Sequence, residues 1–317
     1  MSNLPAKLDF GHAPETIEFW KRLVREALSL SLSTPFYLFS ALPIAEKISE
    51  LESAFAAAGF GTKNSKLKIQ NWLSCKTQPV APLLRWWREQ GRGIEVVSEF
   101  ELRAALAEGY APENILVNGP AKHHWLQKVV GQASSLSSSK LKNTTGKMPV
   151  PLLQNLSVNF DSPAELAALL PLAKKLNWRC GIRVLTGEEF DPENPEFPTQ
   201  FGFAPDEAVA ALKKLRCEKA RVETVHFHLR SNVSAVAVYE RAIAEVAEVC
   251  RAAKFSPQIL DIGGGIPVRQ VLTRGGKVYD GEFGLRSFAK MLRQSVKLFP
   301  DVREIWLENG RFVGASS

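Results

Sequence analysis

Lys76 is the first residue whose type and position could do chemistry. It directly follows the apolar run Asn71–Cys75. At the end of such a run a lysine can sit in a partly dry pocket, where the neutral amine is favoured. A neutral amine attacks an aldehyde to form a Schiff base. The alternative is a lysine whose stem is covered and whose ammonium reaches solvent.

Two histidines, His226 and His228, are two residues apart in the run Val225–Ser231. In a strand they lie on the same face, so one of them could stack on an aromatic ligand. A pair of metal ligands is the alternative, although no Asp, Glu or Cys nearby in the sequence supplies a convincing third ligand. A structural role also stays open, and it fits His226 better than both residues together.

Three glycines, Gly263–Gly265, follow the predicted strand Gln258–Ile262. Because glycine has no Cβ, the backbone N–H groups of such a run can approach an anion closely, and phosphate is the natural guest. A tight turn is the alternative. The spacing is not GxGxxG, so it does not indicate a dinucleotide site.

Glu308 and Arg311 are three residues apart after the apolar run Ile305–Leu307. Arginine suits a phosphate, and a buried carboxylate suits a protonated ring nitrogen. A surface ion pair is the alternative. Taken together, the four features offer an amine for an aldehyde, a stacking ring, a phosphate cradle and an acid for a ring nitrogen. These are the requirements of pyridoxal 5′-phosphate (PLP).

Short apolar runs that alternate with amphipathic segments must position these residues. Such alternation predicts parallel strands joined by helices. Capping boxes at Ser98–Glu101 and Ser162–Glu165 predict two helix starts. The strands fit an eight-stranded α/β barrel with one extra strand, or a doubly wound open sheet; in a barrel the four features share one rim. The predicted strands are Phe36–Phe39, Ile69–Ser74, Ile94–Val97, Ile115–Asn118, Leu156–Phe160, Cys180–Leu185, Val222–His228, Gln258–Ile262 and Glu304–Leu307.

The composition is that of a globular protein. The 317 residues are 45% hydrophobic and 23% charged. The net charge of +7 is scattered, so we set nucleic-acid binding aside. The four cysteines form no CxxC pair, which argues against structural zinc and a disulfide scaffold. Neither a signal peptide nor a run of about 20 apolar residues is present, so we expect a cytoplasmic protein without a membrane span.

Several segments resemble the fold-type III PLP-dependent decarboxylases, the group that contains diaminopimelate, ornithine and arginine decarboxylases. DIGGGIP at Asp261–Pro267 matches closely, and HFHLRS at His226–Ser231 resembles HxHxGS. The matching segments run in the family's order. They are Thr34–Phe39, Ser74–Thr77, Glu95–Leu102, Asn118–Lys122, Phe201–Phe203, His226–Ser231, Asp261–Pro267 and Glu308–Arg311.

The resemblance implies a (β/α)8 barrel of the alanine racemase type. The barrel would span residues 36–317 and carry an inserted flexible loop at about 131–155. Residues 1–35 would pack with a C-terminal β domain that follows in the family and is missing from this sequence. The intact family members would be homodimers. We expect neither a metal, nor nucleic acid, nor a membrane as a partner.

The resemblance also implies the roles of the site residues. Lys76 would form the Schiff base, and His228 would stack on the pyridine ring; these two would be catalytic. Glu308 would bind the ring nitrogen. The phosphate would be held by Ser231, Gly263, Gly264, Gly265 and Arg311. The implied reaction on a small amino acid is loss of the α-carboxylate through a quinonoid, as in diaminopimelate decarboxylase.

Departures from the family pattern leave alternatives open. Arg230 replaces a glycine beside the phosphate region, Glu95 replaces an aspartate, Asn309 replaces a proline, and Gln200 replaces a lysine. Together with the missing domain, these changes allow a truncated, inactive homologue that binds PLP or a partner. An amino-acid racemase is disfavoured, because alanine racemases place an arginine where Glu308 stands.

Overall fold

The structure is a computed structural model. It describes residues 14–30, 32–33, 35–62, 65, 67–131, 153–188, 201–268, 271–272, 278–279 and 283–314. Most of the predicted insertion at 131–155 lies outside these residues, as do Thr34, Gln200 and the first part of the segment 1–35.

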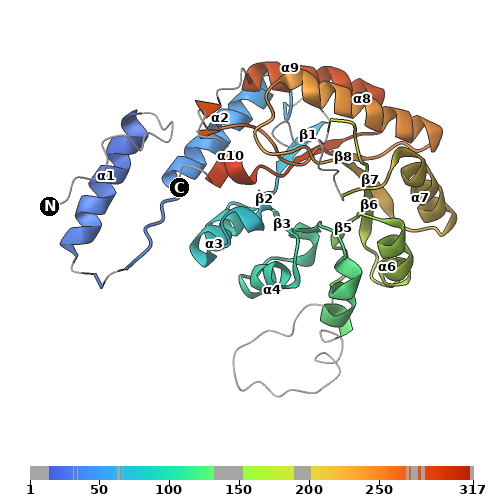
Figure 1. Ribbon diagram of the computed structural model, residues 1–317, viewed down its shortest axis with the longest axis horizontal. Helices are drawn as coiled ribbons and strands as arrows, with labels where there is room; N and C mark the ends of the chain where they lie inside the picture. Colours follow the sequence, from blue (N-terminus) through green and yellow to red (C-terminus); the bar gives the residue numbers. More distant parts are fainter. Residues whose placement is uncertain are drawn as a thin grey trace.

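Parallel strands close into a barrel (Figure 1). The sheet order is β1-β11-β8-β7-β6-β5-β4-β3-β2, and every neighbouring pair is parallel. The strands β1 and β2 stand at the two ends of this order, but in the chain only Trp72 separates them. The sheet therefore closes on itself. The barrel is confirmed, and the open doubly wound sheet is wrong. The strands are β1 Lys68–Asn71, β2 Leu73–Ser74, β3 Ile94–Val96, β4 Ile115–Val117, β5 Ser157–Phe160, β6 Arg179–Arg183, β7 Val222–His226, β8 Ile259–Asp261 and β11 Glu304–Leu307.

Helices surround the barrel, and α1 lies apart from it (Figure 1). The α-helices are α1 Pro14–Ser29, α2 Leu42–Ala57, α3 Ala81–Glu89, α4 Glu99–Ala107, α6 Pro163–Lys175, α7 Pro205–Cys217, α8 Val236–Ala252, α9 Leu285–Ser295 and α10 Gly310–Gly314. Short 3-10 turns are η1 Cys75–Thr77, η2 Pro112–Asn114, η3 Lys122–His124 and η4 Val296–Leu298, and a small hairpin pairs β9 Val271–Leu272 with β10 Val278–Tyr279. None of the described helices is long and apolar enough to cross a membrane.

The two predicted helix starts are confirmed. Ser98 Oγ accepts the Glu101 N–H, and Ser162 Oγ accepts the Glu165 N–H, each at 3.3 Å. Each glutamate reaches back one residue further than in the usual capping box. Glu101 accepts the N–H of Val97 at 2.7 Å, before the cap.

The prediction of a strand at Phe36–Phe39 is wrong. This stretch is irregular, and the Tyr37 side chain is fully exposed. The other eight predicted strands all contribute to the barrel. A closed sheet has no free edge, so a ninth apolar run finds no strand to pair with in it.

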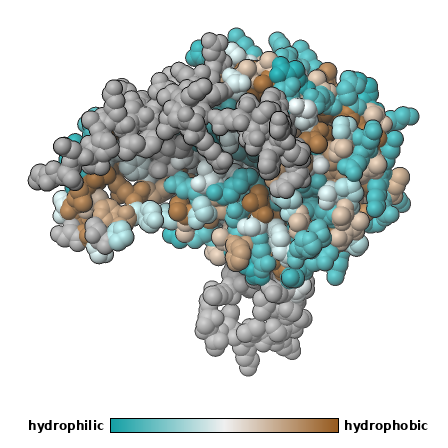
Figure 2. Space-filling model, in the orientation of Figure 1, coloured by the Kyte–Doolittle hydropathy of each residue, from teal (hydrophilic) through white to brown (hydrophobic). Residues whose placement is uncertain are grey.

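Two apolar clusters divide the core. The larger lies between the strands and the helices; the smaller is Trp72, Leu116, Ile259 and Trp306. Alternation along the strands places this smaller cluster inside the barrel, towards the amino ends of the strands. On the face that Figure 2 shows, the coloured surface is largely hydrophilic, and apolar residues of α1 such as Val24 and Leu28 are exposed. Polar groups border the smaller cluster too, since the Arg179 guanidinium lies 5.2 Å over the Trp306 ring and the Trp306 N–H donates to Glu304 at 2.9 Å.

Candidate active site

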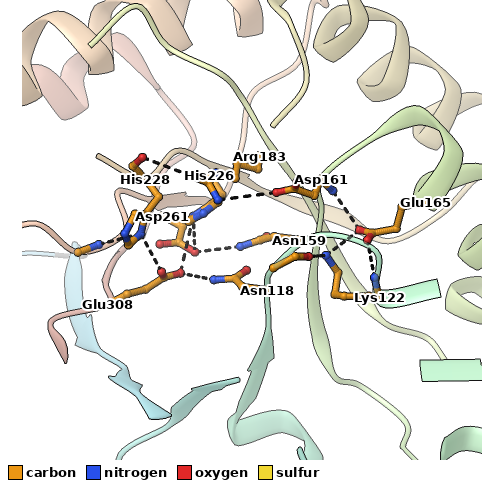
Figure 3. A network of polar contacts seen from close by, with 12 residues as sticks. Asn118, Lys122, Asn159, Asp161, Glu165, Arg183, His226, His228, Asp261 and Glu308 are labelled. Atoms are coloured by element: carbon orange, nitrogen blue, oxygen red, sulfur yellow. Dashed lines mark hydrogen bonds and ion pairs between the residues drawn. The ribbon is translucent and has the colours of Figure 1, made fainter. Parts of the chain in front are cut away.

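Polar side chains from seven strands converge at the carboxyl ends of the barrel strands. Figure 3 shows those from β4, β6, β7, β8 and the end of β11. This convergence is what the parallel arrangement predicts. The side chains are Ser74 at the end of β2, Glu95 on β3, Asn118 after β4, Arg183 on β6, His226 and His228 at β7, Asp261 on β8 and Glu308 after β11.

Glu308 is the centre of this group. It is 3% exposed, so the alternative of a surface ion pair with Arg311 is wrong. Its Oε1 accepts the Asn118 Nδ2–H at 2.5 Å, and its Oε2 lies 3.2 Å from His228 Nδ1. Its own N–H donates to the Gly263 carbonyl at 2.8 Å. A buried carboxylate fixed from three strands is suited to hold a positive ligand atom.

The two histidines share one face, as predicted, with ring centroids 6.2 Å apart. Nitrogen atoms of both lie within 4.8 Å of a Glu308 oxygen and of each other, so a third potential metal ligand is present after all. His226 Nδ1 is also 3.0 Å from Asp261 Oδ2. Sequence reasoning missed these acids because they come from neighbouring strands more than 30 residues away.

Burial sets the charges of this cluster. It lowers the pKa of His226 to about 4, and it lowers the pKa of His228 against the opposing effect of Glu308. Both imidazoles are therefore neutral at neutral pH. Burial raises the pKa of Asp261 to about 7, although hydrogen bonds from Gly263 and Asn159 favour its ionised form.

The three glycines are needed for close packing. A Cβ on Gly263 would lie 2.5 Å from His228 Nδ1, and one on Gly264 would lie 2.6 Å from the Glu308 carbonyl. Gly263 and Gly265 also have positive φ, at 63° and 105°. The glycine run therefore forms a close contact between the ends of β7, β8 and β11. It does more than make a tight turn. The Gly264 N–H donates to His228 Nδ1 at 3.2 Å.

The predicted phosphate residues lie around this junction. The Val233 N–H donates to the Gly265 carbonyl at 2.9 Å, which joins the loop of Ser231 to the glycine run. Ser231 and Arg311 are both exposed, and Arg311 lies in α10 directly after the Glu308 loop. Their contact with a phosphate stays a prediction.

Lys76 lies in η1 and is exposed, so the expected partly dry pocket is not what the structure shows. Its ammonium nevertheless acts on the site. It is the strongest influence that favours the ionised form of Glu95, whose pKa is raised by burial. Glu95 is 1% exposed, and its Oε2 accepts the Ser74 hydroxyl at 2.5 Å. The neighbouring Cys75 is buried, which raises its pKa to about 12 and removes it as a nucleophile.

Arg183 is a site residue that sequence reasoning missed. Its Nη2 donates to the His228 carbonyl at 3.5 Å, and its Nη1 lies 3.8 Å from Asp161 Oδ1. Its guanidinium also stacks over Phe201 at 4.8 Å. Strand alternation could have found it, because Arg183 is two residues beyond Gly181 on the inward face of β6.

Comparison with known proteins fits this geometry. The family described as "Pyridoxal-dependent decarboxylase, pyridoxal binding domain" matches residues 61–315. The chain belongs to this family. Its cofactor is therefore PLP, and the resemblance drawn from the motifs is confirmed.

Individual relatives agree with the family assignment. The chain is 23% identical over 252 residues to diaminopimelate decarboxylase from Zymomonas mobilis, covering 76% of this chain and 54% of the relative. It is 25% identical over 285 residues to the Deinococcus radiodurans enzyme of that name, covering 90% and 62%. The chain thus spans little more than half the length of these curated relatives.

Solved structures share the fold. Arginine decarboxylase from Campylobacter jejuni has a TM-score of 0.69 at 20% identity, covering 92% of this chain and 47% of that one. Diaminopimelate decarboxylase from Helicobacter pylori, complexed with L-lysine, has a TM-score of 0.66 at 21% identity, covering 91% and 66%. The barrel is therefore that of the PLP-dependent decarboxylases.

The residues present fit PLP. Glu308 offers a buried carboxylate to a protonated ring nitrogen, and His228 offers a neutral ring beside it. The glycine run lies next to both. Lys76 is near enough to act electrostatically on His228.

Proposed function

We propose that this chain is the cofactor-binding barrel of an amino-acid decarboxylase of the diaminopimelate decarboxylase type, with Lys76 forming the Schiff base to PLP. The observation that carries the proposal is the buried Glu308 carboxylate, held by Asn118 beside His228. When bound, PLP supplies an electron sink for the electron pair released as the α-carboxylate leaves as carbon dioxide.

Glu308 keeps the ring nitrogen protonated. The Asn118 amide donates to its Oε1 and so fixes the position of the carboxyl group. An anion at this position stabilises a proton on the nitrogen that faces it. His228 stacks on the ring, and because burial lowers its pKa it does so as a neutral imidazole, without repelling a cationic ring.

Lys76, the residue proposed to form the Schiff base, interacts with the buried Glu95 carboxyl group. The Lys76 ammonium favours the ionised form of Glu95, so the two side chains interact electrostatically across the mouth of the barrel. At the rim, the glycine run, Ser231 and Arg311 bind the phosphate.

The substrate is a small amino acid, and the whole protein is a homodimer in the cytoplasm; these are proposals drawn from the family. Because the chain covers 54% and 62% of its relatives, the activity of the whole protein is a proposal as well. Arg230, in place of the family glycine, favours a second candidate, a homologue that binds PLP without turnover.

The near-visible absorption spectrum of the protein with PLP tests the first step. Wild type is expected to show a Schiff-base band that K76A lacks. K174A is the matched control, because Lys174 is an exposed lysine on α6 that pairs with exposed Glu218. A band that survives in K76A would refute the role of Lys76.

Decarboxylation is tested by carbon dioxide release from diaminopimelate, lysine, ornithine and arginine. Release from one of them by wild type, and not by K76A, would support the decarboxylase. A normal Schiff-base band with no release from any substrate would favour the second candidate.

A further inference from the structure

A fully buried ion pair lies beside the site and has no part in the proposed chemistry. Lys122 Nζ is 2.6 Å from Glu165 Oε1, and both side chains are 0% exposed. Lys122 begins η3 after β4, and Glu165 is in the first turn of α6. Burying two charges is costly unless each is well satisfied. Since neither group can reach a ligand, the pair must act through other residues.

The Glu165 carboxylate joins three elements. Its Oε2 accepts the Lys122 backbone N–H at 2.9 Å, and its Oε1 accepts the Asp161 N–H at 3.0 Å. The Lys122 ammonium also donates to the Gly119 carbonyl at 2.5 Å. The pair therefore ties the end of β4, the end of β5 and the start of α6 together (Figure 3).

The segment held in this way is strained. Between Asn118 and Lys122 the chain contains Gly119 with φ 82° and Ala121 with φ 58°. Alanine rarely adopts a positive φ, and it does so only where surrounding contacts impose the conformation. The Lys122 contacts with Glu165 and Gly119 flank this turn on both sides.

Two routes lead from the pair to the cofactor residues. On the first, Gly119 directly follows Asn118, whose amide donates to Glu308. On the second, Asp161 approaches Arg183, which donates to the His228 carbonyl. The contact between His228 and Glu308 closes the ring (Figure 3).

We propose that Lys122 and Glu165 are positioning residues, which hold the turn after β4 so that Asn118 keeps the Glu308 carboxylate in place for the ring nitrogen. The inference rests on the proposed function in one respect, the binding of the PLP ring nitrogen by Glu308. The link from the ion pair to Asn118 stands without the cofactor. Two separate measurements are therefore needed.

The first measurement needs no PLP. The side-chain amide of Asn118 is observed by NMR after selective 15N-asparagine labelling, and N118S identifies its signal. In wild type, the short bond to a buried carboxylate moves this signal downfield. We expect K122M/E165M, which removes both charges at similar volume, to shift it towards the position of a solvent-exposed amide. E165Q keeps the side-chain shape but leaves the Lys122 charge unpaired, so it serves as a second variant that breaks the ion pair.

The second measurement is PLP affinity by absorption titration. K122M/E165M and E165Q are expected to bind PLP at least about tenfold more weakly, the usual loss when a supporting partner is removed. Two control variants on α6 should bind as wild type does. K174M breaks an exposed ion pair, and L169A removes buried packing without touching the ring.

The results separate the inference from the proposed function. An unchanged Asn118 signal in folded K122M/E165M or E165Q would overturn the inference, and so would an equal loss of PLP affinity in L169A. Wild type that fails to bind PLP would refute the proposed function alone, because the Asn118 signal would still test the positioning role.

Discussion

Alanine at Gly263 is expected to lower the free energy of unfolding by about 2–5 kcal/mol. Part of this cost is conformational, because φ is 63° and an L side chain pays about 1–2 kcal/mol there. The rest is steric. The new Cβ would lie 2.5 Å from His228 Nδ1 and 2.9 Å from the Phe227 carbonyl. Forcing a methyl group into such a site costs about 1–3 kcal/mol.

Gly61 offers a matched control for the steric part. Its φ is also 63°, but a Cβ there would meet nothing within 4 Å. G61A should therefore cost only the conformational part, about 1–2 kcal/mol. Urea denaturation followed by circular dichroism measures both variants, with equal m-values as the condition for comparing them.

The same pair of variants also separates packing from cofactor binding. Because the Cβ at Gly263 pushes directly on His228, G263A should weaken PLP binding, whereas G61A should not. Equal destabilisation by G263A and G61A would refute the claim that the glycine run is a close junction between strands.

Three further predictions concern the same site. E308Q keeps an acceptor for Asn118 but loses the charge, so turnover should fall about 10–100-fold, which steady-state kinetics can measure; unchanged kcat would contradict it. For Asp261, whose pKa rises on folding from 3.8 to about 7, the native state holds more protons than the unfolded state between these pH values. Wild-type stability should therefore fall relative to D261N as pH rises through that window, by at most roughly 1.4 kcal/mol per pH unit; parallel pH profiles would refute this. Y239F loses the bond from the Tyr239 hydroxyl to the Gly264 carbonyl at 2.7 Å and should cost about 0.5–1.5 kcal/mol in urea denaturation, and no loss would show that the bond is not needed.

Most barrel strands were predictable because they contain short apolar runs that are largely buried. β4, for example, is Ile115–Val117, with all three residues buried. The same reasoning failed for Phe36–Phe39, which is equally apolar. Composition shows that a segment can be a strand, but only the closed topology shows that no edge is left for it.

The convergence of the site was predictable for the same physical reason, since parallel strands bring their carboxyl ends to one rim. Individual partners were not. The hydrogen bond from Asn118 to Glu308 joins residues 190 positions apart in the chain. Glu165 was expected only as a helix cap, and its second role depends on Lys122, which lies 43 residues away.

The arrangement of charge at the barrel mouth favours one orientation of bound PLP over the other. The carboxyl groups of Glu95, Asp261 and Glu308 lie deep and are at most 3% exposed, while His226 next to them is neutral. Arg311 lies outside them at the rim and is exposed. The inner part therefore favours a positive group, and the rim favours a negative one.

PLP carries one group of each charge: a ring nitrogen that can be protonated at one end, and a phosphate dianion at the other. With the ring inward, each end meets the opposite charge. With the phosphate inward, a phosphate charge 4 Å from Glu308 would be repelled by about 4 kcal/mol at an effective dielectric constant of about 20. A penalty of that size corresponds to roughly a thousandfold in affinity, so the Glu308 charge alone would strongly disfavour the reversed orientation.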